Sequence, residues 1–399
     1  MATHMNDTST MFESFKLGSS TLSHRVALAP CTRMRAEKAG DFYVPGDLMV
    51  EYYTQRATAG GLLITDACPI SETACGYLGV AGIFNSEQVS GWKRVTDAVH
   101  SKGGIIYCQL WHVGRATVAQ LIKGTQPISS VSTALEGDSL FPGVSYRDAP
   151  PRAMIKDDFI EVTNDFVKAA KVAIEKAGFD GVEIHGANGY LLDQFLHDNV
   201  NTRTDTYGGK SIKNRARFPL EVLKSVCTEI GAEKTAIRLS PFNYFQDTRD
   251  SDPNATWSYV CQEIVNLDEP IAYVHMIEPR FDEKLNAEDK IKSLEEQVGK
   301  AEGFSLNGFR SILKNKNISF IAAGGFSKET ALKKLEAGDA DVIAFGRHFI
   351  ANPDLVERFK ADLPLNKYDR PSFYGSDPPK NGYTTYPTYA NSQLNGKAH

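Results

Sequence analysis

Eight short apolar runs, most of them followed by a helical pattern, constrain the fold of this chain more than any other feature. The runs are almost continuously hydrophobic, as expected of parallel strands that are buried on both faces. They span residues 26–29, 62–65, 105–110, 181–184, 235–239, 273–277, 319–322 and 342–345. Helical patterns lie between them, for example at 88–101, 157–176, 214–230 and 328–337. Eight such units predict an α/β fold of the (β/α)8 TIM barrel type.

A doubly wound Rossmann sheet is the alternative fold, but no run is followed by its GxGxxG signature. A barrel needs roughly 250 residues, so much of the 399-residue chain must be insertions. We expect one domain over 1–399. It should carry an inserted hairpin or lid at about 118–153, after the third strand, and a C-terminal tail at 364–399 that wraps the barrel. A second, charged insertion is expected at 280–303. Asn352-Pro353 predicts a helix start, with Asn352 as the N-cap.

Charge and cysteine usage narrow the class of protein. The net charge is −5 and no run of Lys or Arg stands out, which argues against a nucleic-acid partner. No apolar run reaches transmembrane length, and the first residues lack the apolar core of a signal peptide. The six cysteines contain no CxxC pair, which favours reduced thiols. We therefore expect a cytoplasmic protein that binds neither nucleic acid nor membrane.

The end of the fourth apolar run carries the densest set of reactive groups. His185, Asn188 and Tyr190 follow it closely, with Gly186 and Gly189 between them. An imidazole, an amide and a phenol at the C-terminal end of a barrel strand can grip an oxygen and deliver a proton. These groups lack the usual His, Cys and carboxylate set of a zinc site, so we expect no metal. The alternative is a structural histidine beside an ordinary Asn-Gly turn.

Glycines after the last two runs indicate a phosphate site. Gly324-Gly325 follow the seventh run and Gly346-Arg347 follow the eighth, which is where barrels of this type commonly hold a phosphate. Glycines let backbone N–H groups approach an anion, and Arg347 can add charge-assisted hydrogen bonds. The alternative is that these glycines only form tight turns.

Three polar residues at other strand ends suit a planar heterocycle. Thr32, Gln109 and Arg238 offer a hydroxyl, an amide and a cation. They match the alternating donors and acceptors of a flavin, and a cation there would stabilise the reduced, anionic ring. Alternatively, Arg238 pairs with a barrel carboxylate such as Glu183, and Gln109 is a hydrogen-bonded core residue. These three residues alone leave both interpretations open.

Several longer motifs resemble the Old Yellow Enzyme family of FMN-dependent NADPH dehydrogenases and ene-reductases. The motifs include HRVALAPCTRMR (24–35), CQLWHVGR (108–115), HGANGYLLDQF (185–195), NTRTDTYGG (201–209) and FGRHFI (345–350). The resemblance covers nearly the whole chain, and no single motif would be as specific as the set. The combination of His185 with Asn188 is similar to the yeast and fungal branch.

The resemblance implies a role for each residue singled out above and for four more. The implied flavin contacts are Thr32, Ala67, Gln109 and Arg238 for the ring, and Gly324, Gly325, Gly346 and Arg347 for the phosphate. The implied substrate contacts are His185 and Asn188 for the oxygen, and Trp111, Phe245 and Tyr374 for the cavity wall. Tyr190 is implied as the proton donor.

The resemblance also implies a reaction in two halves. NADPH or NADH reduces FMN, and hydride then passes from flavin N5 to the β-carbon of an α,β-unsaturated aldehyde or ketone. Tyr190 protonates the α-carbon, since a phenol with a pKa of about 10 keeps its proton at neutral pH. The alternatives are a flavin reductase of quinones or nitro compounds, a barrel lyase, and a flavin-binding protein without catalysis. The expected partner is a small-molecule substrate, and the sequence leaves a homodimer open.

Overall fold

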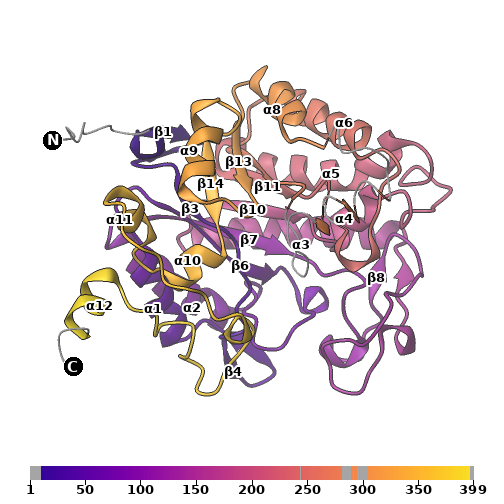
Figure 1. The fold of residues 1–399 in the computed structure, drawn as a ribbon. Coiled ribbons are helices and arrows are strands. Elements are labelled where there is room, and N and C mark those ends of the chain that lie inside the picture. Colours follow the sequence, from indigo (N-terminus) through magenta and orange to yellow (C-terminus); the bar gives the residue numbers. More distant parts are fainter. Residues whose placement is uncertain are drawn as a thin grey trace.

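A closed barrel of eight parallel strands forms the centre of the molecule (Figure 1). The computed structural model describes residues 10–242, 244–280, 289–290, 292–293, 296 and 304–395. Around the barrel the strands are β3 (Val26–Leu28), β6 (Leu62–Pro69), β7 (Ile105–Trp111), β10 (Gly181–Gly186), β11 (Thr235–Leu239), β12 (Tyr273–Ile277), β13 (Ser319–Ala323) and β14 (Val342–Phe345). Each predicted run overlaps one of these strands, so the predicted barrel is confirmed.

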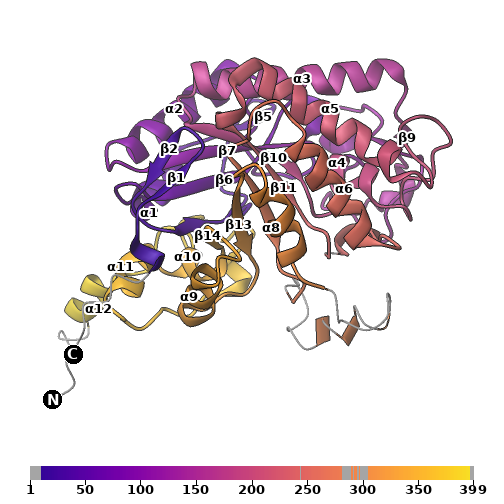
Figure 2. The same ribbon diagram turned by 90° about the horizontal axis from the view of Figure 1, so that it is seen from above.

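Helices surround the barrel, as the view from above shows (Figure 2). They are α1 (Asp47–Arg56), α2 (Ser86–His100), α3 (Lys156–Glu175), α4 (Leu191–Leu196), α5 (Ile212–Ile230), α6 (Pro253–Val265), α8 (Asn307–Lys314), α9 (Lys328–Glu336), α10 (Arg347–Ala351), α11 (Leu355–Lys360) and α12 (Tyr389–Asn395). Local signals fix several starts, because Asn85 forms a capping box with Gln88 at α2, and Ser211 caps α5. The four predicted helical patterns correspond to α2, α3, α5 and α9.

An N-terminal hairpin closes the bottom of the barrel. It consists of β1 (Phe15–Leu17) and β2 (Ser20–Leu22), joined at Gly18 with a φ of +52°. A Cβ at Gly18 would lie 2.2 Å from the Glu233 carbonyl oxygen, so the turn needs glycine. Leu17 and Leu22 are fully buried in one cluster with residues of the barrel strands. The opposite end, where the strands terminate, is therefore the end that can accept a ligand.

The predicted insertion after the third barrel strand covers this upper end. Its base is closed by β8 (Ile128–Ser129) and β9 (Arg152–Ala153), which pair in parallel, while an antiparallel bridge joins Asp138 to Ser145 further out. Only the outer part of the insertion, around the Asp138–Ser145 bridge, is therefore a hairpin. Leu135 is buried in the same hydrophobic cluster as Trp111, which confirms the expected lid position. The second predicted insertion, 280–303, lies mostly outside the described residues.

The C-terminal tail wraps the barrel as predicted (Figure 1, yellow). Arg33, in the loop after β3, donates from Nε to the Phe373 carbonyl oxygen at 3.0 Å and from Nη2 to the Gly382 oxygen at 2.7 Å. Tyr383 stacks on Tyr52 of α1, with ring centroids 4.2 Å apart. The tail is therefore fixed to the loop that carries Thr32.

The predicted helix start at Asn352-Pro353 is wrong. Asn352 follows the end of α10, and α11 begins at Leu355 with Asp354 as its N-cap. The Asn352 side chain donates to the His348 carbonyl oxygen at 2.8 Å and accepts from the Asn366 N–H at 2.7 Å. A tertiary contact that fastens the tail has therefore overridden the local Asn-Pro signal. Among the described helices, every one is too short or too polar to cross a membrane.

Candidate active site

Strand pairing brings the predicted ring-binding residues together. Ala67 pairs with Gln109, Gln109 with Glu183, and His185 with Arg238, across the neighbouring strands β6, β7, β10 and β11. A register shift in β6 between Ile64 and Ala67 allows the Ala67–Gln109 pairing. These side chains are almost fully buried, with Arg238 the most exposed of them at 8%. The upper end of the barrel therefore holds an amide, an imidazole and a guanidinium within one layer.

Aromatic rings form the wall beside this layer. Trp111 stacks with His185 at a centroid distance of 6.4 Å, and Tyr190 packs edge-on against both rings, at 4.8 Å and 5.1 Å. Tyr77 stacks on Trp111 at 5.1 Å, and its hydroxyl lies 3.0 Å from the Tyr190 hydroxyl. Tyr77 was not predicted as a site residue, because it lies in an irregular loop with no motif around it. The wall thus presents two hydrogen-bonded phenols on an apolar surface.

His185 is set up as a neutral hydrogen-bonding group. Burial lowers its pKa well below the usual 6.5, and the charge of Arg238 acts in the same direction. Its Nδ1 atom is buried and has no hydrogen-bond partner among the described residues, and the same holds for Nε1 of Trp111. A neutral imidazole donates through one nitrogen, so His185 can hold a ligand oxygen without becoming charged.

Asn188 lies in a rigid turn next to His185. Asn188 and Gly189 both adopt positive φ, +58° and +73°. The Asn188 N–H donates to Ser240 Oγ and the Gly189 N–H donates to Asp193 Oδ2, each at 2.8 Å. A Cβ at Gly189 would lie 2.6 Å from the Phe245 carbonyl oxygen, so the loop that carries Phe245 packs directly on this turn. The turn that carries Asn188 and the loop that carries Phe245 are therefore held together.

A single buried amide ties three loops of the site to one another. Gln194 Oε1 accepts from Ser129 Oγ at 2.8 Å and from the Arg115 N–H at 3.2 Å. Its Nε2 atom donates to the Gly189 oxygen at 2.7 Å and to the Val113 oxygen at 3.1 Å. The insertion, the loop after β7 and the Asn188–Gly189 turn thus share one fully satisfied side chain. Gln194 lies in the motif at 185–195, but this linking role could not be predicted from the sequence.

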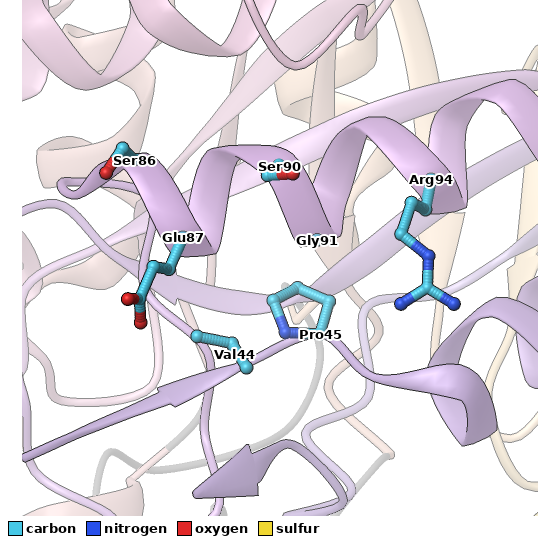
Figure 3. A pocket seen from close by; sticks show the side chains of 7 residues that line it. All are labelled: Val44, Pro45, Ser86, Glu87, Ser90, Gly91 and Arg94. Atoms are coloured by element: carbon cyan, nitrogen blue, oxygen red, sulfur yellow. The ribbon is translucent and has the colours of Figure 1, made fainter. Parts of the chain in front are cut away.

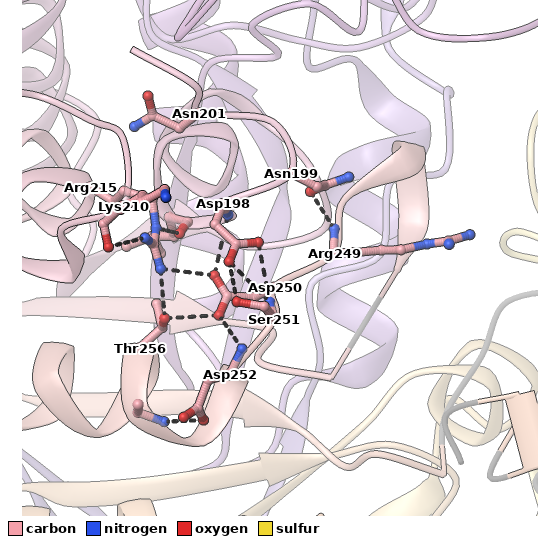
Figure 4. A network of polar contacts seen from close by, with 12 residues as sticks. Asp198, Asn199, Asn201, Lys210, Arg215, Arg249, Asp250, Ser251, Asp252 and Thr256 are labelled. Carbon is pink, nitrogen blue, oxygen red and sulfur yellow. Dashed lines mark hydrogen bonds and ion pairs between the residues drawn. The ribbon is translucent and has the colours of Figure 1, made fainter. Parts of the chain in front are cut away.

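A polar network fixes the loop after β11 (Figure 4). Arg215 of α5 and Asp250 are 3% and 2% exposed, and their Nη2 and Oδ2 atoms are 3.2 Å apart. Thr256 accepts from Arg215 at 3.0 Å and donates to Asp250 at 2.9 Å. The Asp198 N–H also donates to Asp250. This network anchors the segment between Phe245 and α6.

Glycines form an open cradle after β13 and β14. Gly324 and Gly325 have φ of +119° and +66°, and a Cβ at Gly325 would approach only Arg280 Nε, at 3.9 Å. Arg280 donates from that Nε to the Gly324 oxygen at 3.1 Å, so a cation lies beside the two glycines that follow β13. Arg280 was not predicted as a site residue, although it lies in the loop directly after β12. The space and the charge fit the phosphate of FMN, and the Gln109, Arg238 and His185 layer fits its ring.

Two predicted residues lie nearer the surface. Thr32 is half-buried, and the adjacent Arg33 N–H donates to Asp66 Oδ2 at 2.9 Å, which fixes the loop. Tyr374 is 63% exposed, and the Gly375 N–H beside it donates to the Arg33 oxygen at 3.3 Å. Tyr374 therefore lies on the exposed rim near Thr32, and its role as a wall residue stays a prediction.

A surface groove elsewhere on the molecule is not a second candidate (Figure 3). It lies between α2 and the end of β5 (Phe42–Val44), away from the strand ends. Helix α2 and Pro45 pack closely at the bottom of the groove, because a Cβ at Gly91 would lie 2.6 Å from the Pro45 oxygen. An exposed ion pair between Arg94 and Asp47 borders it. The described part of the chain also contains no group of three or more potential metal ligands.

Burial of histidines makes stability depend on pH. Burial lowers the pKa of His112 to about 3 and that of His185 well below 6.5. Below about pH 6.5 the unfolded chain binds these protons and the folded protein does not, so we expect each histidine to reduce the free energy of unfolding by about 1.4 kcal/mol per pH unit. Urea unfolding in a pH series measures the slope. His112→Gln should make it shallower, and an unchanged slope would contradict the assignment.

Comparison with known proteins identifies relatives that are flavin oxidoreductases. Residues 10–366 match the profile of the NADH:flavin oxidoreductase / NADH oxidase family. Flavin oxidoreductase hxnT of Emericella nidulans is 56% identical over 94% of this chain and 97% of that protein. 12-oxophytodienoate reductase 1 of Oryza sativa subsp. japonica is 46% identical over 94% and 91% of the two chains.

Solved structures show the same architecture. An old yellow enzyme homologue from Zymomonas mobilis superposes with a TM-score of 0.82 at 37% identity, over 94% of this chain and 99% of that one. Morphinone reductase, solved in complex with tetrahydroNAD, superposes with a TM-score of 0.81 at 38% identity, over 96% and 98% of the two chains. Both proteins are similar in sequence as well as in fold.

Proposed function

Because the chain belongs to the Old Yellow Enzyme family and is an FMN-dependent NAD(P)H oxidoreductase, we propose that it is an ene-reductase of α,β-unsaturated aldehydes and ketones. One observation carries the proposal: the Tyr190 phenol packs edge-on against the neutral imidazole of His185, at 5.1 Å. Reducing a carbon–carbon double bond requires a proton donor to carbon as well as a grip on the carbonyl oxygen. Related proteins named as reductases of 12-oxophytodienoate and morphinone support an oxo substrate.

The chain's own residues divide the work. His185 and Asn188 hydrogen-bond the substrate oxygen and stabilise the negative charge that develops on it, where one donor is worth roughly 3 kcal/mol. Tyr190 donates its phenolic proton to the α-carbon. Trp111, Phe245 and Tyr374 line the approach. FMN, once reduced by NADPH or NADH, supplies the hydride for the β-carbon.

We propose the following contacts for the cofactor. Thr32, Ala67, Gln109 and Arg238 contact the ring, and Gly324, Gly325, Gly346 and Arg347 hold the phosphate. The positive-φ glycines Gly324 and Gly325 and the buried polar layer support this placement. We further propose that residues 1–399 form one FMN-binding domain and that the enzyme acts in the cytoplasm; a homodimer stays an open expectation.

Product analysis tests the proposed reaction. Purified protein, NADPH and 2-cyclohexenone are incubated without oxygen, and the products are separated by gas chromatography. We expect cyclohexanone in an amount equal to the NADPH consumed. NADPH oxidation that depends on a quinone or a nitro compound and yields no cyclohexanone would replace the proposal with its main alternative.

Replacing Tyr77 by Phe tests the pair of phenols. Removing the hydroxyl 3.0 Å from that of Tyr190 loses one hydrogen bond, worth about 1 kcal/mol, so we expect enone reduction to slow about fivefold. Stopped-flow reoxidation of the reduced enzyme by 2-cyclohexenone measures this step. Tyr146→Phe is the control, because Tyr146 packs on the same cluster. Equal losses in both variants would show that the Tyr77 hydroxyl has no special role.

A further inference from the structure

A fully buried carboxylate in the barrel interior has no part in the reaction described above. Glu183 lies on β10, two residues before His185, and is 0% exposed. Its Oε1 atom accepts from Gln109 Nε2 at 2.7 Å, and its Oε2 atom accepts from His275 Nδ1 at 2.9 Å. The three side chains come from β10, β7 and β12. A carboxylate so far from water is costly unless both oxygens are satisfied, and here they are.

Glu183 is ionised. Burial alone would raise its pKa, but the hydrogen bonds from His275 and Gln109 and the charge of Arg238 outweigh burial and lower it. Burial lowers the pKa of His275, so His275 donates to the carboxylate as a neutral imidazole. An ionised carboxylate only accepts hydrogen bonds. Its neighbours must therefore turn donors toward it.

This requirement decides how the Gln109 amide is oriented. A glutamine side chain can face a neighbour with either its NH2 or its oxygen, but only the NH2 can face Glu183. Oε1 of Gln109 accepts no hydrogen bond from the described part of the chain. The main chain of Gln109 is fixed as well, because its N–H donates to Thr65 Oγ1 at 3.0 Å. The NH2 group of Gln109 is thus hydrogen-bonded to Glu183, and its side-chain oxygen can accept a hydrogen bond from a ligand.

We propose that Glu183 is a positioning residue that locks the Gln109 amide with its carbonyl oxygen toward the cofactor. The inference rests on the proposed placement of Gln109 at the flavin ring. The pyrimidine edge of a flavin carries an N–H donor between two carbonyl oxygens, so an amide oxygen held in place is its natural acceptor. Glu183 contributes to flavin binding through Gln109 and needs no contact with the flavin.

A double-mutant cycle on FMN affinity tests the proposal. Glu183→Gln keeps the shape, but an amide can donate or accept, so Gln109 is free to turn over. FMN is titrated into the apoprotein and the dissociation constant is read from flavin fluorescence. We expect Glu183→Gln to weaken binding about tenfold, Gln109→Ala to weaken it at least as much, and Glu183→Gln to change it less than about twofold in the Gln109→Ala background.

A matched control removes a comparable charge elsewhere. Asp341 accepts from Arg310 Nη2 at 2.7 Å and from the Phe320 N–H at 2.8 Å, next to β14 at the closed end of the barrel. Asp341→Asn should leave FMN affinity unchanged. If Glu183→Gln weakens binding equally in both backgrounds, or not at all, the positioning role is wrong. If Gln109→Ala binds FMN as the parent does, the proposed placement of Gln109 is what fails.

A measurement on the unaltered holoprotein covers the case in which Glu183→Gln does not fold. In protein labelled with 15N-glutamine, the side-chain NH2 of Gln109 is assigned by its loss in Gln109→Ala. We expect a proton shifted downfield that exchanges slowly with solvent, as for a short bond to a carboxylate. Fast exchange of both amide protons would overturn the proposal.

Discussion

Replacing Tyr190 by Phe is expected to slow enone reduction by about 10²–10⁴-fold, the range that general acid catalysis typically contributes. The phenol lies beside the residues proposed to bind the substrate oxygen, since its ring packs edge-on against both His185 and Trp111. Phenylalanine keeps the ring and its packing and removes only the hydroxyl group, which carries the proton and the hydrogen bond to Tyr77. The variant should therefore still bind FMN and still be reduced by NADPH at the parent rate.

The two halves of the reaction are measured separately in stopped-flow experiments. Reduction by NADPH serves as the internal control, because it needs no proton donor to carbon. A Tyr190→Phe enzyme that reduces 2-cyclohexenone at the parent rate would show that the proton comes from another group. Tyr77, whose hydroxyl lies 3.0 Å from that of Tyr190, would then be the first residue to examine.

Replacing Asp250 by Asn is expected to lower the free energy of unfolding by about 3–5 kcal/mol, the usual effect of breaking a buried ion pair. Arg215 would keep its charge at 3% exposure without a counter-ion. The loop that carries Phe245 would also lose its anchor, since Thr256 and Asp198 both donate to Asp250. Urea unfolding followed by circular dichroism measures the loss.

Two further variants separate the buried pair from general effects. Arg249→Ala is the matched control, because its exposed guanidinium points away from the network, and it should change stability by no more than about 0.5 kcal/mol (Figure 4). The double variant Arg215→Met/Asp250→Leu removes both charges and should be less destabilised than Asp250→Asn. A double variant that is worse than the single one would contradict the account of an uncompensated charge.

The barrel could be predicted because buried parallel strands leave a local signature in the sequence. Residues at strand ends, such as Gln109, His185 and Arg238, could be placed for the same reason, since topology brings strand ends to one face. Strand β6 extends to Pro69, beyond the predicted run, because a register shift lets its pairing with β7 continue. Such a shift cannot be read from the hydrophobic pattern. The parallel base of the insertion was equally invisible, because each strand there has only two residues.

The features that escaped prediction depend on contacts between distant segments. Tyr77 and Arg280 lie in loops whose neighbours are set by tertiary packing, and Gln194 acts through three separate loops. Asn352 shows the reverse case, in which a clear local signal for a helix start lost to a contact with Asn366 in the tail. Local chemistry therefore indicated what kinds of groups are present, while the fold decided which of them meet.

A visible absorption spectrum recorded without oxygen tests the central claim most directly. NADPH is added to the purified protein, followed by 2-cyclohexenone. We predict that the yellow flavin band bleaches with NADPH and returns with the enone, which would establish hydride transfer through FMN to a carbon–carbon double bond. A band that bleaches but returns only with oxygen or a quinone would contradict the ene-reductase assignment.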